Sequence, residues 1–124
     1  MSDFKYPKDE KLKKDNEITL LFAKGKWKSC GNLRIIILKN HPDLQTENVK
    51  LGVSVSKRYF KKAVYRNRVK RLLRECYRLN KELFKECFGE KTAAMLFWVS
   101  PEMPEKFQDV EAQFIKLCHS QKKN

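Results

Sequence analysis

Apolar residues recur at three- and four-residue intervals between residues 65 and 79, and this period predicts an amphipathic helix. Its apolar side is predicted to pack on a core through Tyr65, Val69, Leu72, Leu73, Cys76 and Leu79. Its opposite side is basic, with Arg66, Lys70, Arg71, Arg74 and Arg78, and with Arg68 at the flank. Like charges four positions apart repel by about 0.2–0.5 kcal/mol per pair. The pattern therefore indicates a partner that supplies the counter-charge.

Shorter patterns predict the other elements, in the order α-β-β-β-α-β-α. A first helix starts near Asp15 or Asn16, either of which is a suitable N-cap, and stops at Gly25. Strands are expected over 26–30 and 33–38, joined by a tight turn at residues 31–32, and alternation predicts a third strand over 49–56. After the basic helix, residues 80–88 continue as a second helical piece ending at Gly89. Residues 92–99 form an apolar run typical of a buried strand, and residues 107–118 carry the stripe of a last helix.

These elements predict an α/β fold, in which helices pack on a mixed sheet as an α+β sandwich. The face under the helices is expected to hold Leu33, Ile35, Ile37, Phe97 and Val99. The other face is also apolar, with Ile36, Leu38, Leu96 and Trp98. It is either covered by the first helix or forms an open cleft that receives unstacked bases of single-stranded nucleic acid. Core packing is the commoner role for any one of these side chains.

Composition and charge favour one nucleic-acid-binding domain. With 124 residues, of which 41% are hydrophobic, the chain is expected to form a single domain over 15–120 after a flexible basic segment over 1–14. The net charge is +13, and residues 57–74 hold nine basic side chains and no acidic one. Such a surface binds polyanions by neutralising phosphates and releasing counterions. Nucleic acid is the first expectation, and a membrane surface is a weaker one.

Several other classes lack support in the sequence. No apolar run has the length of a membrane span and the N-terminus lacks the apolar stretch of a signal peptide, so a cytoplasmic protein is expected. The four cysteines form no C-x-x-C pair and are interpreted as reduced core residues, and the two histidines do not complete a zinc-ligand pattern. No catalytic residue and no metal ligand is assigned, because no His/Asp/Cys or paired-carboxylate arrangement with catalytic spacing is present.

Two segments resemble the signature of the bacterial ribonuclease P protein subunit: LGVSVSKR at 51–58 and AVYRNRVKRLLRE at 63–75. The resemblance joins a strand ending in Ser-Val-Ser-Lys to a helix that opens with Arg-Asn-Arg. It implies a mixed four-stranded sheet in a fold like domain 2 of ribosomal protein S5. It also implies a left-handed β-α-β crossover from about Val49 to Val99, whereas the general rule predicts a right-handed one.

The resemblance implies that the chain is the protein subunit of ribonuclease P, an endonuclease whose chemistry is carried by a catalytic RNA. That enzyme removes the 5′ leader from precursor tRNA, with Mg²⁺ held mainly by the RNA and no organic cofactor. The implied partners are the ribonuclease P RNA subunit and the precursor leader, and no obligate protein partner is inferred. The residues expected to contact the catalytic RNA near the cleavage site are Lys57, Arg58, Lys61, Lys62, Arg66, Asn67, Arg68, Lys70, Arg71 and Arg74. Arginine suits phosphate because its fork donates two hydrogen bonds. For Asn67 a role as a local cap or turn residue is an equal alternative.

The resemblance also implies a leader-binding cleft between the first helix and the sheet, formed by Ile18, Phe22, Ile36 and Trp98. Phe22 matches an aromatic position of the family, but Ile18 and Ile36 stand where many relatives have aromatic rings. Lys61 and Lys62 stand where relatives often have Gly and a small polar residue, so phosphate contact is expected to offset weaker stacking. The alternative function is a structural or ribosome-associated RNA-binding protein without a role in cleavage. A protein-only nuclease and a DNA-binding helix have less support.

Overall fold

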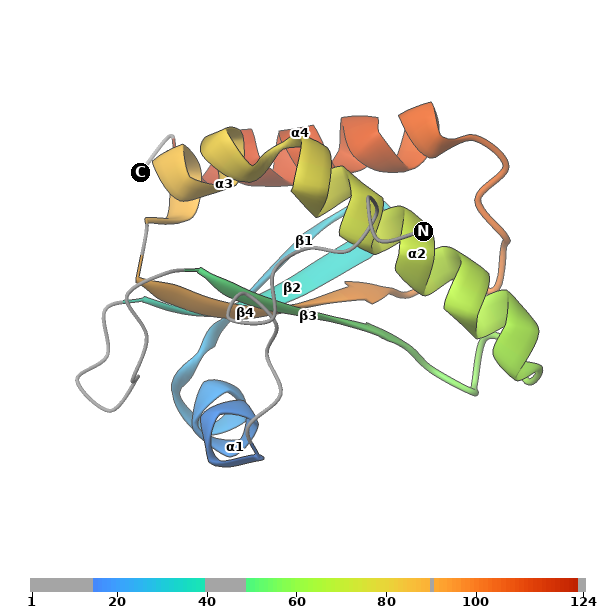
Figure 1. Ribbon diagram of the computed structural model, residues 1–124, viewed down its shortest axis with the longest axis horizontal. Coiled ribbons are helices and arrows are strands. Elements are labelled where there is room, and N and C mark those ends of the chain that lie inside the picture. Colours follow the sequence, from blue (N-terminus) through green and yellow to red (C-terminus); the bar gives the residue numbers. More distant parts are fainter. Residues whose placement is uncertain (1–14, 40–48, 90, 123–124) are drawn as a thin grey trace.

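The computed structural model describes residues 15–39, 49–89 and 91–122, which form helices on both faces of one sheet (Figure 1). The elements in chain order are α1 (Asp15–Lys24), β1 (Lys26–Cys30), β2 (Leu33–Lys39), β3 (Lys50–Val55), α2 (Ala63–Leu79), α3 (Lys81–Phe88), β4 (Thr92–Trp98) and α4 (Phe107–Lys122). The predicted order is confirmed, with α3 as a helix of its own after a break at Asn80. The predicted segment over 1–14 lies outside the described residues.

The sheet is mixed and four-stranded, with the strand order β1-β2-β4-β3. β1 pairs with β2 and β2 with β4 in antiparallel fashion, whereas β3 and β4 are parallel. In Figure 1, β3 lies in front of β4 and both run from left to right, while the chain between them returns above the sheet through α2 and α3. This path is a left-handed crossover, as the resemblance implies and contrary to the general rule.

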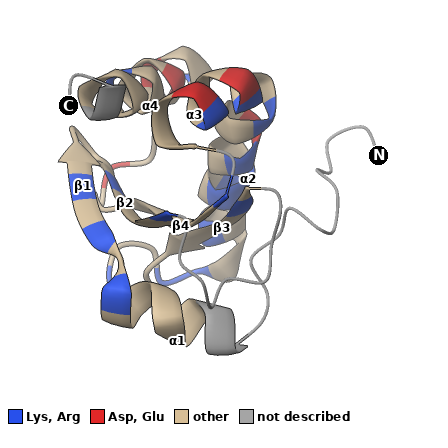
Figure 2. Cartoon of the chain, turned by 90° about the vertical axis from the view of Figure 1, so that its left-hand side faces the viewer, with Lys and Arg blue, Asp and Glu red and all other residues tan. Residues whose placement is uncertain are grey.

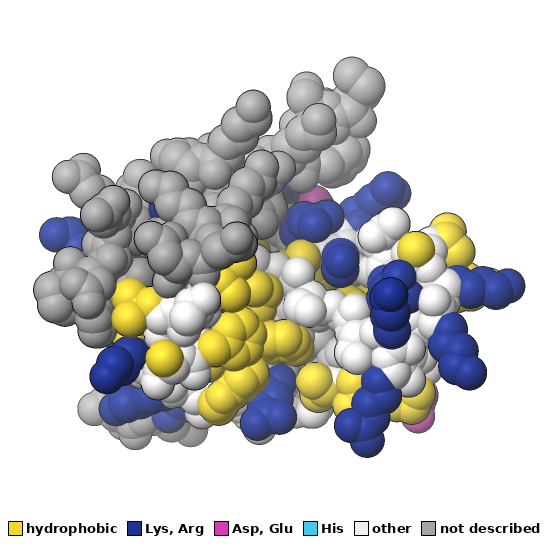
Figure 3. Space-filling model, turned by 90° about the horizontal axis from the view of Figure 1, so that it is seen from below, with side chains coloured by type: hydrophobic (Ala, Val, Ile, Leu, Met, Phe, Trp, Pro, Cys, Tyr) yellow, Lys and Arg dark blue, Asp and Glu magenta, His cyan; other side chains and the backbone are white. Residues whose placement is uncertain are grey.

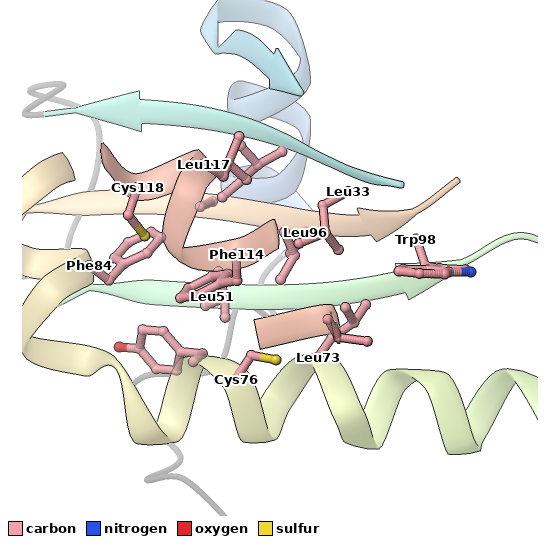
Figure 4. Packing of buried hydrophobic residues seen from close by; sticks show 14 of the residues in the cluster. Leu33, Leu51, Leu73, Cys76, Phe84, Leu96, Trp98, Phe114, Leu117 and Cys118 are labelled. Carbon is pink, nitrogen blue, oxygen red and sulfur yellow. The ribbon is translucent and has the colours of Figure 1, made fainter. Parts of the chain in front are cut away.

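The main core lies between the sheet and the layer formed by α2, α3 and α4. Side chains from these helices and from three strands interlock there, as Figure 4 shows. The largest fully buried members include Leu33, Leu51, Leu73, Leu96, Tyr77, Phe84 and Phe114. Burying an aliphatic or aromatic side chain of this size contributes about 1.5–3 kcal/mol. This core holds the sheet and α2 in a fixed relation, which positions every basic residue of α2.

The assignment of β4 side chains to the two faces is wrong in the sequence analysis. Leu96 and Trp98 belong to the main core, whereas Phe97 packs on the α1 side. The pairing with β2 explains this, because Ile35 lies opposite Leu96 and Leu33 opposite Trp98, and directly paired residues share a face. The residues of β2 are on the faces that their alternation predicts. β4 is apolar at almost every position, so it carries no alternation of its own.

The apolar side of α2 is rotated from the predicted one. Its buried residues are Val69, Leu73, Cys76 and Tyr77, whereas Tyr65 is 45% exposed and Leu79 is 53% exposed. The first turns of α2 extend beyond the end of β4, so their apolar residues have no sheet beneath them (Figure 1). The N-terminal part of α2 therefore projects from the molecule with its side chains open to solvent.

All four cysteines are free; Cys76, Cys87 and Cys118 are buried, and Cys30 is half-buried. Within the described ranges, no group of three or more His, Cys, Asp or Glu side chains could hold a metal ion. None of the helices described has both the length and the apolar character needed to cross a membrane.

Candidate RNA-binding surface

The loop between β3 and α2 is held by hydrogen bonds to Ser56 and by one buried ring. The Ser56 side-chain oxygen accepts the backbone N–H of Arg58 at 3.0 Å, and its carbonyl oxygen accepts those of Tyr59 and Phe60 at 3.1 and 3.2 Å. Phe60 is buried in the main core and anchors the loop. Lys57, Arg58, Lys61 and Lys62, which this loop carries up to α2, are all exposed. These four cations are thus presented on a fixed backbone.

Arg66 closes the same loop from within α2. Its Nη1 donates to the carbonyl oxygens of Phe60 and Lys61, both at 2.8 Å. The helix N-cap, Lys62, makes no side-chain capping hydrogen bond, so the side chain of Arg66 replaces a conventional cap in holding the chain entry. Arg66 is half-buried. The family resemblance predicts that Arg66 contacts RNA, but it does not predict this bond to the loop.

The other basic residues of α2 form the exposed remainder of this surface. Arg68, Arg71 and Arg74 are exposed and Lys70 is half-buried. Asn67 is exposed and lies inside the helix, five residues after the N-cap, so it is neither a cap nor a turn residue. We call the ten predicted residues of this loop and helix, including Arg66, the α2 basic surface. Lys and Arg side chains stand out along that side of the molecule in Figure 3.

The α2 basic surface ends where acidic residues begin. Arg78, which the sequence analysis placed in the cationic row, is half-buried and forms an ion pair with Glu75 three residues earlier, with its Nε 3.1 Å from Oε2 of Glu75. Residues 49–74 contain no Asp or Glu, whereas α3 carries two acids, Glu82 and Glu86 (Figure 2). A polyanion that follows the first turns of α2 therefore meets only positive charge.

A second surface of interest lies between α1 and the sheet. A small core of Leu21, Ile36, Leu38 and Ala93 fixes α1, and Ile18 packs against it. Ile36 is fully buried beneath the helix, so of the predicted cleft residues only Phe22 presents a large exposed apolar surface, at 45%. The predicted face is therefore covered by α1 over Ile36 and open beside Phe22.

Trp98 does not belong to this cleft, which corrects the prediction. It is 3% exposed, lies in the main core on the opposite face, and donates its indole N–H to the carbonyl oxygen of Glu102 at 3.0 Å. Two aromatic residues that sequence reasoning missed stand beside Phe22: Trp27, which is 42% exposed, and Phe97, which is half-buried. The position of Trp27 could have been predicted from the two-residue turn at residues 31–32. This turn sets the register of the hairpin, which places Trp27 opposite Ile36 and so on the same face of the sheet.

The two surfaces together provide what single-stranded and folded RNA require. Exposed cations bind phosphates, and exposed aromatic rings stack on unpaired bases.

The buried thiols contribute no chemistry to these surfaces. Burial raises the pKa of Cys76 to about 12, and the charges of Glu111 and Glu75 have smaller effects in the same direction. Burial, followed by the charge of Cys87, also raises the pKa of Cys118 to about 12. Both thiols therefore stay protonated at neutral pH.

Comparisons with known proteins agree in sequence and in fold. The sequence model of the family described as Ribonuclease P matches residues 6–122. The ribonuclease P protein component of Porphyromonas gingivalis is 40% identical over 111 residues, which cover 87% of this chain and 80% of that protein. The one from Dictyoglomus thermophilum is 37% identical over 86 residues, which cover 69% of this chain and 68% of that protein.

Solved structures share the fold at lower identity. The RNase P protein of Thermotoga maritima superposes with a TM-score of 0.72 at 22% identity, covering 93% of this chain and 97% of that one. A mutant RNase P protein of Staphylococcus aureus superposes with a TM-score of 0.76 at 19% identity, covering 93% of this chain and 90% of that one. The match to the family model spans nearly the whole chain, and the sequence relatives are aligned over most of their length. The chain belongs to the ribonuclease P protein family.

Proposed function

We propose that the α2 basic surface binds the catalytic RNA of ribonuclease P and that the cleft beside α1 binds the 5′ leader of precursor tRNA. The chain is a protein component of ribonuclease P, the RNA-catalysed endonuclease that matures the 5′ end of tRNA. Its partners are therefore the ribonuclease P RNA and precursor tRNA. In the proposed division of labour the RNA performs the cleavage, and no residue of this chain is catalytic.

The observation that carries the proposal is a rigid cationic surface without acids. Eight of its ten residues are exposed, and the loop that carries four of them is fixed by Ser56, Phe60 and Arg66. A preorganised set of cations binds a folded RNA with less loss of side-chain entropy than a flexible basic tail. Its arginines can each hold one phosphate through two parallel hydrogen bonds.

Binding of the catalytic RNA tests the first part of the proposal. The double variant Arg68→Ala/Arg71→Ala removes two exposed arginines and is expected to weaken binding of ribonuclease P RNA by at least about tenfold, or 1.4 kcal/mol. The matched control Lys106→Ala/Lys116→Ala removes two exposed cations, one immediately before α4 and one within it, and is expected to change binding less than about threefold, or 0.7 kcal/mol. Equal losses in the two variants would contradict the proposed site.

Selectivity for the leader tests the second part. Phe22→Ala removes a 45% exposed ring from the cleft, and a stacked base contributes about 1–3 kcal/mol. With the holoenzyme, the variant is expected to weaken binding of precursor tRNA and to leave binding of mature tRNA unchanged. An equal loss for both RNAs would remove the cleft from the leader path.

The residues of the α2 basic surface do not fit a Mg²⁺ site. Magnesium prefers carboxylate and water oxygens, whereas this surface offers lysine and arginine nitrogens, which repel the ion. The enzyme family is a magnesium-dependent ribonucleoprotein. We therefore propose that the RNA partner holds the ions, and that the protein acts with it in the cytoplasm by binding and positioning RNA.

A further inference from the structure

Three aromatic rings from three different elements meet on the α1 side of the sheet. Phe22 of α1 lies 6.1 Å from Trp27 of β1 and 6.2 Å from Phe97 of β4, and the Trp27 and Phe97 rings are 5.4 Å apart, all measured between ring centroids. Trp27 is 42% exposed although it belongs to this cluster. Figure 3 shows hydrophobic side chains gathered on this face, with Lys and Arg side chains around them. Such exposure of a tryptophan is unfavourable unless a partner covers it.

Trp27 carries a cation directly on its ring. The guanidinium carbon of Arg34, in the neighbouring strand β2, lies 4.4 Å from the centroid of the Trp27 ring. A planar guanidinium stacks on aromatic rings and also donates to phosphate oxygens, so one side chain can serve a base and the adjoining backbone. Arg34 is itself exposed and accessible to a ligand.

The surroundings of Trp27 fit a polyanion. β1 is an edge strand, and Lys24 at the end of α1 and Arg34 of β2 lie on the same side of the sheet as Trp27 (Figure 2). Lys26 and Lys28 pair with Ile37 and Ile35 and therefore belong to the other face. Residues 18–39, which form most of this side of the molecule, contain no Asp or Glu. An apolar protein partner would contact the rings but not the cations, whereas single-stranded RNA stacks its bases on the rings and binds the cations through its phosphates.

We propose that Trp27 and Arg34 form a nucleotide-binding subsite on the edge strand β1, where an unpaired base of the precursor leader stacks and Arg34 contacts an adjoining phosphate. The inference rests on the proposed function and adds a second position to the leader path, which runs from Phe22 across the aromatic cluster to β1. Ile36, the residue opposite Trp27, is fully buried under α1 and offers no stacking surface. Of these two paired residues, only Trp27 therefore offers a ring on which a base of the leader can stack.

A double perturbation of protein and leader tests this subsite in the holoenzyme. Precursors are prepared with one abasic nucleotide at each leader position in turn, and their binding is measured with wild type and with Trp27→Ala. In wild type, one abasic position is expected to weaken binding by at least about fivefold, the weak end of what a stacked base contributes. In Trp27→Ala the abasic nucleotide at the same position is expected to cause no further loss of affinity. In Trp27→Phe it is expected to weaken binding again, though less than in wild type.

Controls separate this inference from the proposed function and from misfolding. Leu79→Ala removes another exposed apolar side chain, on α2, and is expected to leave the abasic profile of wild type unchanged. An unaltered profile in Trp27→Ala, with leader binding still sensitive to Phe22→Ala, would overturn the subsite and keep the cleft. Insensitivity to both variants would overturn the leader cleft as well. Unchanged affinity of Trp27→Ala for ribonuclease P RNA shows that the variant is folded.

Discussion

The arginines of α2 look equivalent in the sequence but perform different tasks at the scale of single residues. Arg66 donates hydrogen bonds from one guanidinium nitrogen to two loop carbonyl oxygens, Arg78 forms an ion pair with Glu75, and Arg68 is exposed. Spacing along a helix predicts which side a residue occupies. It does not predict that the chain before the helix turns back within reach of Arg66. Only the folded loop therefore distinguishes the arginine that shapes the surface from those that stay exposed for the proposed contact with RNA.

Arg66→Ala is predicted to lower stability as well as RNA affinity. Loss of the bonds to Phe60 and Lys61 is expected to reduce the free energy of unfolding by about 1–3 kcal/mol, since both acceptors lose a charged donor. Arg66→Lys keeps the charge without the fork and is expected to recover only part of this loss. Urea unfolding of the free protein measures both. Arg68→Ala serves as the control, with an expected change below about 0.5 kcal/mol; an equal effect of the two alanine variants would contradict the loop-closing role.

Because the Cys76 thiol is buried, the protein is predicted to lose stability at alkaline pH. The pKa of Cys76 rises from 9.0 to about 12 in the folded protein, so the unfolded chain releases this proton at lower pH than the folded one. Deprotonation therefore favours unfolding as the pH rises above about 9, and the contribution is fully present below that pH. Urea unfolding at increasing pH measures the decline. Cys76→Ala is less stable at neutral pH because of its cavity, but its stability is expected to fall less steeply with pH; an identical slope would refute the assignment.

At the scale of elements, much of the fold follows from local pattern. The period of α2, the alternation in β3 and the turn at residues 31–32 predict the elements close to their observed bounds. The faces of β4 could not be predicted because its residues are apolar on both sides, so only the pairing with β2 decides which side each faces. For the same reason Trp98 is predicted to line the cleft, whereas the structure places Phe97 there. The crossover hand comes from the family resemblance, and the general rule gives the opposite one.

The junction between α1 and β1 predicts a strong effect of one added methyl group. A Cβ at Gly25 would lie 2.5 Å from the carbonyl oxygen of Leu21 and 2.7 Å from Cγ1 of Ile36. Gly25→Ala is therefore expected to push α1 off the sheet and to lower the free energy of unfolding by about 1–2 kcal/mol, after the entropy gained from losing a glycine. Urea unfolding measures the loss. Leader binding should weaken more than binding of ribonuclease P RNA; the reverse order would contradict the assignment of α1 to the leader.

At the scale of the whole molecule, charge is divided between two sides. Residues 18–39 and 49–74 hold fifteen Lys and Arg and no Asp or Glu, and they form α1 beyond its first turn, three strands and most of α2. Acidic residues occur in the last turns of α2, in α3, in the segment before α4 and in α4. A molecule divided in this way orients itself toward RNA before contact. Its net charge of +13 is thus concentrated where binding is proposed.

The concentration of charge predicts a steep salt dependence of RNA binding. Each phosphate neutralised contributes about 0.7–0.9 to the slope of log affinity against log salt. Arg68→Ala/Arg71→Ala is expected to reduce that slope by about one to two units, whereas Lys106→Ala/Lys116→Ala leaves it close to wild type. Titration of ribonuclease P RNA over a range of salt concentrations measures the slopes. A shallow slope in wild type would contradict binding through many phosphates.

The most direct test of the central claim is cleavage of precursor tRNA at low magnesium by ribonuclease P RNA, with and without this protein. Wild type and Lys106→Ala/Lys116→Ala are expected to stimulate cleavage, Arg68→Ala/Arg71→Ala to lose most of the stimulation, and the protein without RNA to cleave nothing. Stimulation by the arginine double variant equal to that of wild type would contradict an action through the α2 basic surface. Tight RNA binding by wild type without any stimulation would contradict the proposed role in cleavage itself.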